Sequence, residues 1–153
     1  MSCMRINVVD LTQDELRDLL VAVSLEWERR FSVAPGITSA IAEYDAAKLK
    51  ETSLEIGKGR DASYTAVTKG VDFQNGNVRY QVKSNRPSGK SGSPVTLVSK
   101  ASNYNWDKLI WTLYDRVYNL KEAWEFSRDD YRERFDRKKR ISPDDMRLGL
   151  RLK

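Results

Sequence analysis

The sequence predicts an α/β fold, because helix-like and strand-like hydrophobic patterns follow one another along its 153 residues. Residues 12 to 31 and 37 to about 56 carry apolar side chains at the spacing of amphipathic helices. Residues 70 to 85 alternate polar and apolar side chains around an Asn-Gly pair, which is typical of a β-hairpin. A chain of this length is expected to bury one core, so we expect a single domain, residues 1 to 153.

The first predicted helix, residues 12 to 31, begins at a capping box. Thr12 is followed three residues later by Glu15, a pair whose side chains satisfy the free amide groups at a helix start. Pro35-Gly36 then separates this helix from the next one. The apolar residues that recur at helical spacing are Leu16, Leu19, Leu20, Val23 and Trp27.

The second predicted helix places an acidic residue at the boundary of the core. Its apolar face contains Ala42, Ala46 and Leu49. At about 100° per residue, Glu43 and Lys50 fall beside that face. Glu43 is therefore a candidate for a site that lies at the edge of the core.

The predicted hairpin carries its polar side chains on one face. In its first strand Asp72 alternates with apolar neighbours, and Asn75-Gly76 is expected to form the turn. In its second strand the apolar residues Val78, Tyr80 and Val82 alternate with Arg79, Gln81 and Lys83. Asp72, Gln81 and Lys83 are therefore expected to lie close together, although the sequence does not fix the register of the two strands.

The second half of the chain predicts two more strands and a helical end. Residues 109 to 114 and 120 to 126 are rich in apolar residues, with Trp111 and Trp124 as expected core anchors. After Ser127 the chain is charged and basic, and residues 128 to 153 are expected to form a helical tail. Its last short helix should begin at Ser142-Pro143, where serine caps and proline fits the first turn.

The composition excludes several kinds of catalytic site. Histidine is absent, which removes the commonest general base and the commonest ligand of transition metals. Carboxylates and lysines remain, and they suit Mg²⁺ chemistry at a phosphate, as does a net charge of +5. The single cysteine, the lack of a signal-peptide pattern and the lack of a long apolar run predict a cytoplasmic protein without a membrane segment.

The polar residues of the hairpin carry a resemblance to a known family. Gln81 and Lys83 are two apart on one strand, so their side chains leave the same face about 6.6 Å apart. With Asp72 on the neighbouring strand and Glu43 on an earlier helix, residues 37 to 127 resemble the PD-(D/E)XK superfamily of restriction-type nucleases. The segments GVD and QVKS are similar to those of Mrr-like restriction endonucleases and archaeal Holliday-junction resolvases. Two features depart from the pattern, because no proline precedes Asp72 and Gln81 replaces the commoner acid.

The resemblance implies a restriction-endonuclease-like core, in which helices flank a mixed central β-sheet, and Mg²⁺-dependent hydrolysis of DNA phosphodiester bonds, with Mn²⁺ as a substitute. It implies that Asp72, the side-chain oxygen of Gln81 and the carbonyl of Val82 ligate the metal. Glu43 would hold a second metal or a metal-bound water. Lys83 would orient or help to deprotonate the attacking water and offset charge on the phosphate. The alternative is a catalytically lapsed domain of the same fold that binds DNA or a protein, because Gln81 removes one negative charge.

The expected partner is duplex or branched DNA. Between Phe73 and Trp106 the sequence has basic residues and no acidic ones. A 153-residue chain leaves little room for a specificity domain, so cleavage of both strands would require a homodimer or a partner subunit. Tyr104 and Trp106 are expected in the core rather than stacked on bases. The residues expected to contact DNA phosphates are Arg79, Arg86, Lys90 and Lys100.

Overall fold

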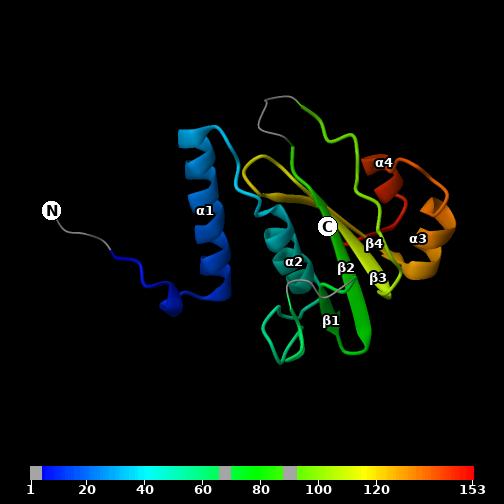
Figure 1. The fold of residues 1–153 in the computed structure, drawn as a ribbon, viewed down its shortest axis with the longest axis horizontal. Coiled ribbons are helices and arrows are strands. Elements are labelled where there is room, and N and C mark those ends of the chain that lie inside the picture. The colour runs from blue at the N-terminus through cyan, green and yellow to red at the C-terminus, as the bar shows by residue number, and fades with distance from the viewer. Residues whose placement is uncertain (1–4, 66–69, 88–92) are drawn as a thin grey trace. The chain divides into compact units, whose positions relative to one another are not determined.

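The computed structural model describes residues 5–65, 70–87 and 93–153 (Figure 1). The chain divides into two compact units, one ending at Ile37 and one beginning at Thr38. The first contains a short 3-10 helix, η1 (Val8–Asp10), and helix α1 (Gln13–Phe31). The second contains α2 (Thr38–Leu49), β1 (Phe73–Asn75), β2 (Val78–Asn85), β3 (Lys108–Tyr114), β4 (Leu120–Ser127), α3 (Arg128–Phe135), α4 (Pro143–Met146) and β5 (Leu150–Arg151).

The second unit is built on a mixed sheet of five strands in the order β1-β2-β3-β4-β5. Strands β2 and β3 are parallel, whereas the other neighbouring pairs are antiparallel. Parallel neighbours need a crossover connection, and β2 and β3 are far enough apart in the sequence to allow one. The predicted α/β class is therefore confirmed.

Helices α2 and α3 lie on opposite sides of this sheet (Figure 1). On the α2 side, the Tyr114 hydroxyl donates a 2.6 Å hydrogen bond to the Asp45 carboxylate. On the α3 side, Trp111 is fully buried as predicted, whereas Trp124 is partly buried and packs against the same core. Trp106 is also fully buried, so its predicted place in the core is confirmed. The buried residues of this core are Val98, Ala101, Trp106, Leu109, Trp111, Phe126, Tyr131, Phe135, Ile141 and Met146.

The two predicted N-terminal helices form, but the second is shorter than predicted. The capping box of α1 is present, because Glu15 N–H donates to Thr12 Oγ1 over 3.1 Å and Thr12 N–H to Glu15 Oε1 over 3.0 Å. Helix α2 ends at Leu49 rather than near residue 56. Glu51 adopts a left-handed backbone conformation with φ of 57°, and the Thr52 N–H turns back to the Ala47 carbonyl. This local termination does not show in hydrophobic periodicity.

The hairpin also forms, with a turn one residue later than predicted. Asn75 pairs with Val78, so the two-residue loop is Gly76-Asn77 and not Asn75-Gly76. Gly76 has a φ of 59°, a conformation that glycine adopts without steric penalty. Because the loop has two residues, it fixes the register: Phe73 lies opposite Tyr80, and their rings stack with centroids 4.7 Å apart.

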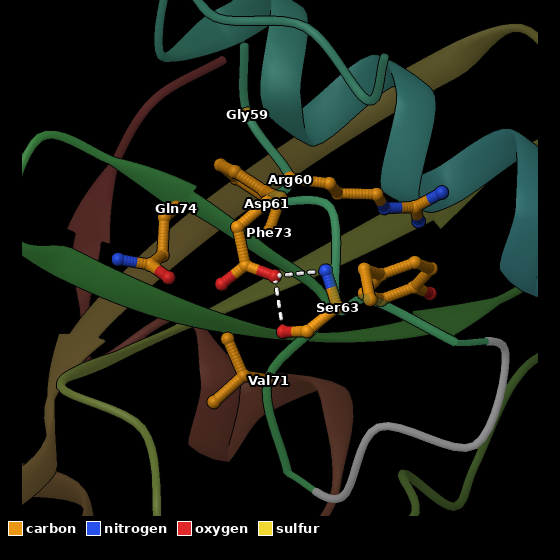
Figure 2. A pocket seen from close by; sticks show the side chains of 8 residues that line it. Gly59, Arg60, Asp61, Ser63, Val71, Phe73 and Gln74 are labelled. Atoms are coloured by element: carbon orange, nitrogen blue, oxygen red, sulfur yellow. Dashed lines mark hydrogen bonds between the residues drawn. The ribbon is translucent and has the colours of Figure 1, made fainter. Parts of the chain in front are cut away.

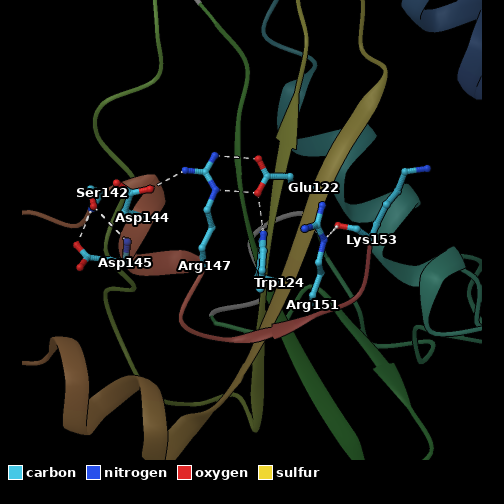
Figure 3. Close-up of polar contacts among 8 residues, drawn as sticks. All are labelled: Glu122, Trp124, Ser142, Asp144, Asp145, Arg147, Arg151 and Lys153. Atoms are coloured by element: carbon cyan, nitrogen blue, oxygen red, sulfur yellow. Dashed lines mark hydrogen bonds and ion pairs between the residues drawn. The ribbon is translucent and has the colours of Figure 1, made fainter.

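The C-terminal residues are part of the second unit rather than a tail. Tyr131 and Phe135 of α3 are buried in the core, and β5, which the sequence did not predict, pairs with β4. Helix α4 begins after Ser142, as predicted. The Arg147 guanidinium joins α4 to β4 by two 2.8 Å contacts with the Glu122 carboxylate and one of 2.8 Å with Asp144 (Figure 3). No helix among the described residues has both the length and the apolar character that crossing a lipid bilayer requires.

Candidate functional site

The hairpin register brings Asp72 next to Gln81. The Asp72 N–H donates a 2.8 Å hydrogen bond to the Tyr80 carbonyl, and β1 starts one residue later, at Phe73. Asp72 therefore occupies the point where the edge strand separates from β2. After Tyr80, the backbone groups of β2 on the β1 edge no longer pair with a neighbouring strand.

The Asp72 carboxylate replaces the missing strand. Its Oδ2 accepts hydrogen bonds from the Gln81 side-chain amide and from the Val82 N–H, each 2.8 Å long. A backbone N–H that is withdrawn from water needs such an acceptor, so Asp72 also has a structural role. Asp72, Gln81 and Val82 are thus brought together as predicted.

Glu43 reaches the same place from α2. Its side chain is only 21% exposed and accepts a 2.9 Å ion-pair contact from Arg60 Nη2. Burial raises the pKa of Glu43, and the charge of the adjacent Asp72 carboxyl and a hydrogen bond with it raise the pKa further. The Arg60 guanidinium opposes these effects, and the resulting pKa is about 7. The positive charge of Arg60 therefore does not fully offset the burial of Glu43 and the charge of the neighbouring Asp72 carboxyl group.

Arg60 is a member of the site that the sequence did not predict. Its Nε donates a 3.1 Å hydrogen bond to the Asp72 carbonyl, and its guanidinium lies 4.1 Å from the centre of the Tyr64 ring. The sequence around Arg60 is polar and has no hydrophobic periodicity, so no pattern there indicates such a contact. The neighbouring Gly59 is closely packed in the structure, since a Cβ there would lie 1.7 Å from the Ser53 carbonyl oxygen.

A cavity of about 100 Å³ lies on the other side of this loop (Figure 2). Gly59 is joined to β1, because its carbonyl accepts a 2.8 Å hydrogen bond from the Gln74 N–H. The Asp61 carboxylate accepts a 2.9 Å hydrogen bond from the Ser63 N–H within the same loop. The stem of Arg60 borders the cavity, whereas its guanidinium points toward α2 (Figure 2). Contacts on both sides therefore fix the loop that carries Arg60.

Lys83 lies on the same face of β2 as Gln81, but the structure records no direct contact between them. Register with β3 places Gln81 beside Leu109 and Lys83 beside Trp111, on the α3 side of the sheet. The Lys83 side chain is half-buried and forms no ion pair or hydrogen bond with another described residue. Its ammonium group is therefore not held by another described side chain, and it lies on the sheet face opposite to α2, from which Glu43 approaches.

The donor atoms of the site fit one hard divalent cation. Glu43 and Asp72 supply carboxylate oxygens, and the Gln81 side chain and the Val82 carbonyl supply neutral oxygens, which Mg²⁺ and Mn²⁺ accept. A cation between Asp72 and Gln81 requires the Gln81 amide to turn, because its nitrogen now faces Asp72. Within residues 5–65, 70–87 and 93–153, no three Asp, Glu, Cys or His side chains form a metal-binding cluster.

The predicted phosphate-binding residues are largely held by the protein itself. Arg79 forms a 3.1 Å ion pair with Asp107, and Arg86 Nε donates a 2.8 Å hydrogen bond to the Arg116 carbonyl. Lys100 donates to the Asp136 and Lys138 carbonyls that follow α3. Lys90 lies outside the described residues. Arg79 is the member of this set that shares the β2 face with Gln81 and Lys83.

No protein-family model matches this sequence, and no curated protein sequence is significantly similar to it. The likeness to the PD-(D/E)XK pattern therefore depends on the identity and arrangement of Glu43, Asp72, Gln81 and Lys83.

Proposed function

We propose that the chain is a divalent-metal-dependent endonuclease that hydrolyses DNA phosphodiester bonds, with a restriction-endonuclease-like core. The observation that supports this best is the meeting of Glu43 from α2 with Asp72 and Gln81 from the hairpin. The Asp72 carboxyl destabilises the ionised form of Glu43, and a bound divalent cation would relieve that repulsion. Carboxyl groups with strongly shifted pKa values are concentrated at functional sites, which supports a functional role for this pair.

Glu43, Asp72, the turned Gln81 amide and the Val82 carbonyl would hold the metal ion. When bound, Mg²⁺ would supply a Lewis acid that lowers the pKa of a coordinated water and offsets charge on the phosphate. Lys83 would hold that water or a phosphate oxygen by an ammonium hydrogen bond, about one strand repeat from Gln81. Arg79, two residues before Gln81 on the same face, would guide the DNA backbone once it leaves Asp107.

A second candidate is a DNA-binding domain of the same fold without catalytic activity. It is favoured by the hydrogen bond from the Gln81 amide to Asp72, which satisfies both groups without a metal. The ion pair between Arg60 and Glu43 has the same effect. In this case the site would be a stable polar cluster that orders the edge of the sheet.

Nicking of supercoiled plasmid separates the two candidates. The nuclease should nick with Mg²⁺ or Mn²⁺ and stop in EDTA, and the Asp72→Asn variant should be inactive. Asn keeps an acceptor oxygen for the Val82 N–H, so this variant should fold. Retention of gel-shift binding with no nicking in any divalent metal would favour the binding domain instead.

A further inference from the structure

We propose that Arg60 is a positioning residue that pairs with one of the two site carboxylates, so that a divalent cation binds firmly only together with a nucleic-acid phosphate. Because Arg60 belongs to the metal site of the proposed nuclease, this role rests on that function. It names the group that completes the site, which is a phosphate oxygen of the substrate.

The contacts of Arg60 fix its guanidinium at two points. Nη2 lies 2.9 Å from Glu43 Oε2, and Nε donates over 3.1 Å to the Asp72 carbonyl. The Tyr64 ring covers one face of the group, and the side chain is only 15% exposed. A planar guanidinium makes such a two-point contact, whereas a lysine ammonium in the same place would bind as a point charge. Arg60 is therefore part of the folded site and not a mobile surface cation.

The charges of the site show what Arg60 does to a metal ion. Glu43 and Asp72 together carry two negative charges when ionised, and Arg60 balances one of them. Gln81 adds none. Among the described residues no further acidic side chain joins Glu43 and Asp72 to form a cluster of three. The free site therefore offers a divalent cation one uncompensated negative charge, which predicts weak binding.

A phosphate supplies the missing charge. Mg²⁺ is commonly bound by one or two carboxylates together with substrate phosphates, and it keeps several of its waters. Lys83 forms no ion pair with another described residue, so it is available to attract a phosphate to the same side of β2 as Gln81. The cation and the DNA backbone should therefore bind cooperatively, and each should tighten the other by the same factor.

Binding measurements with Ca²⁺ test this coupling without relying on cleavage. Anisotropy of a labelled duplex would give the DNA affinity in Ca²⁺ and in EDTA at equal ionic strength, with a gel to confirm that the duplex stays intact. Calorimetry would give the affinity for Ca²⁺ alone. The variants are Arg60→Gln and, as a control, Arg137→Gln, which removes one positive charge from an exposed residue outside the site.

We expect Ca²⁺ to tighten DNA binding by the unmodified chain about tenfold or more, which is within the usual range of coupling between two ligands. Arg60→Gln should bind Ca²⁺ alone several-fold more tightly and should lose most of the coupling, whereas Arg137→Gln should keep it. Equal coupling in Arg60→Gln and the unmodified chain would overturn the role of Arg60.

If Arg60→Gln does not fold, the unmodified chain still decides, because absence of coupling there overturns the proposal. Plasmid nicking separates this result from the proposed function. A chain that couples Ca²⁺ and DNA but never nicks with Mg²⁺ would refute the nuclease and support the coupled site. A chain that nicks but shows no coupling would refute the role of Arg60 alone.

Discussion

Replacing Gln81 by glutamate tests the geometry of the site most directly. The Gln81 amide donates a 2.8 Å hydrogen bond to Asp72 Oδ2, and Glu43 interacts with the same carboxyl group. Gln81→Glu removes that donor and adds a third carboxyl group. Loss of a hydrogen bond to a charged group costs about 1.5–3 kcal/mol, and repulsion adds to this loss. Without metal at pH 7.5 we expect the free energy of unfolding to fall by about 2–3 kcal/mol.

A divalent cation should reverse this loss. Binding at a concentration of 100 times Kd stabilises a folded protein by about 2.7 kcal/mol. In thermal denaturation, Gln81→Glu should therefore melt about 5–10 °C below the unmodified chain in EDTA and recover most of the difference in Mg²⁺ or Mn²⁺. Plasmid nicking at a fixed Mg²⁺ concentration should also increase, because the site regains the acid that the family pattern contains.

The pH dependence of Gln81→Glu has a definite sign. The adjacent Asp72 carboxylate should raise the pKa of the new carboxyl group in the folded state, so the folded protein should bind more protons than the unfolded one and lose stability as pH rises. The loss should be small at pH 5 and larger at pH 7.5. Asn77→Asp is a matched amide-to-acid control in the exposed turn of the same hairpin. If Gln81→Glu behaves like this control in both EDTA and Mg²⁺, Gln81 does not lie beside Asp72 and the proposed site is wrong.

Three further predictions concern single residues. Lys83→Ala should lower the nicking rate by about 100-fold or more and change the unfolding free energy by less than about 0.5 kcal/mol, because the Lys83 side chain forms no ion pair or hydrogen bond with another described residue. Glu43 has a folded-state pKa of about 7, so its contribution to stability should be lost as pH rises from about 4.5 through 7. Between about pH 4.5 and 7, the unfolding free energy of Glu43→Gln, measured by urea denaturation, should therefore fall by about 2–3 kcal/mol less than that of the unmodified chain. The exposed Glu133→Gln should show the same pH dependence as the unmodified chain. Glu122 has a pKa lowered to about 2 by Arg147, so Arg147→Ala should cost about 1 kcal/mol at pH 7 and progressively less as pH falls toward 2.

Each of these outcomes has a clear opposite. Full nicking by Lys83→Ala would assign the catalytic cation elsewhere. An unchanged pH profile for Glu43→Gln would show that the Glu43 carboxyl is not paired with Asp72. An Arg147→Ala variant that loses the same stability at pH 7 and pH 3 would show that packing of the arginine stem, and not its ion pair with Glu122, joins α4 to β4.

The sequence predicts the hairpin and its contents well because the determinants are local. Alternation of polar and apolar residues assigns Gln81 and Lys83 to one face. The residue that lies opposite Asp72 could not be predicted, because the loop is Gly76-Asn77 and not the expected Asn75-Gly76. Glu43 could be placed at the edge of the core from helical periodicity alone. Its contact with Asp72 follows once α2 packs on the sheet, and this requires tertiary structure.

The parts that the sequence did not predict depend on contacts between distant residues. Arg60 reaches Glu43 across 17 positions and lies in a loop without periodicity. Strand β5 has two residues, too few for a pattern, and it forms because β4 offers an unpaired edge. Arg86 and Lys100 had the composition of a DNA-binding surface, yet both donate to backbone carbonyls of their own chain. A run of basic residues in a sequence therefore suggests a negatively charged ligand, but it does not reveal which of those residues are already held by carbonyl groups of the same chain.

A glutamine at position 81 and an arginine at position 60 are mutually consistent. Asp72 is satisfied by the amides of Gln81 and Val82, and Glu43 is paired with Arg60, so every acidic group of the site has a partner without a metal. We therefore expect EDTA to leave the melting temperature of the unmodified chain unchanged while it abolishes nicking. A third carboxylate, as in Gln81→Glu, would instead make folding depend on the cation. A fall in the melting temperature of the unmodified chain in EDTA, restored by Mg²⁺ but not by Na⁺ at equal ionic strength, would contradict this account of the charge balance.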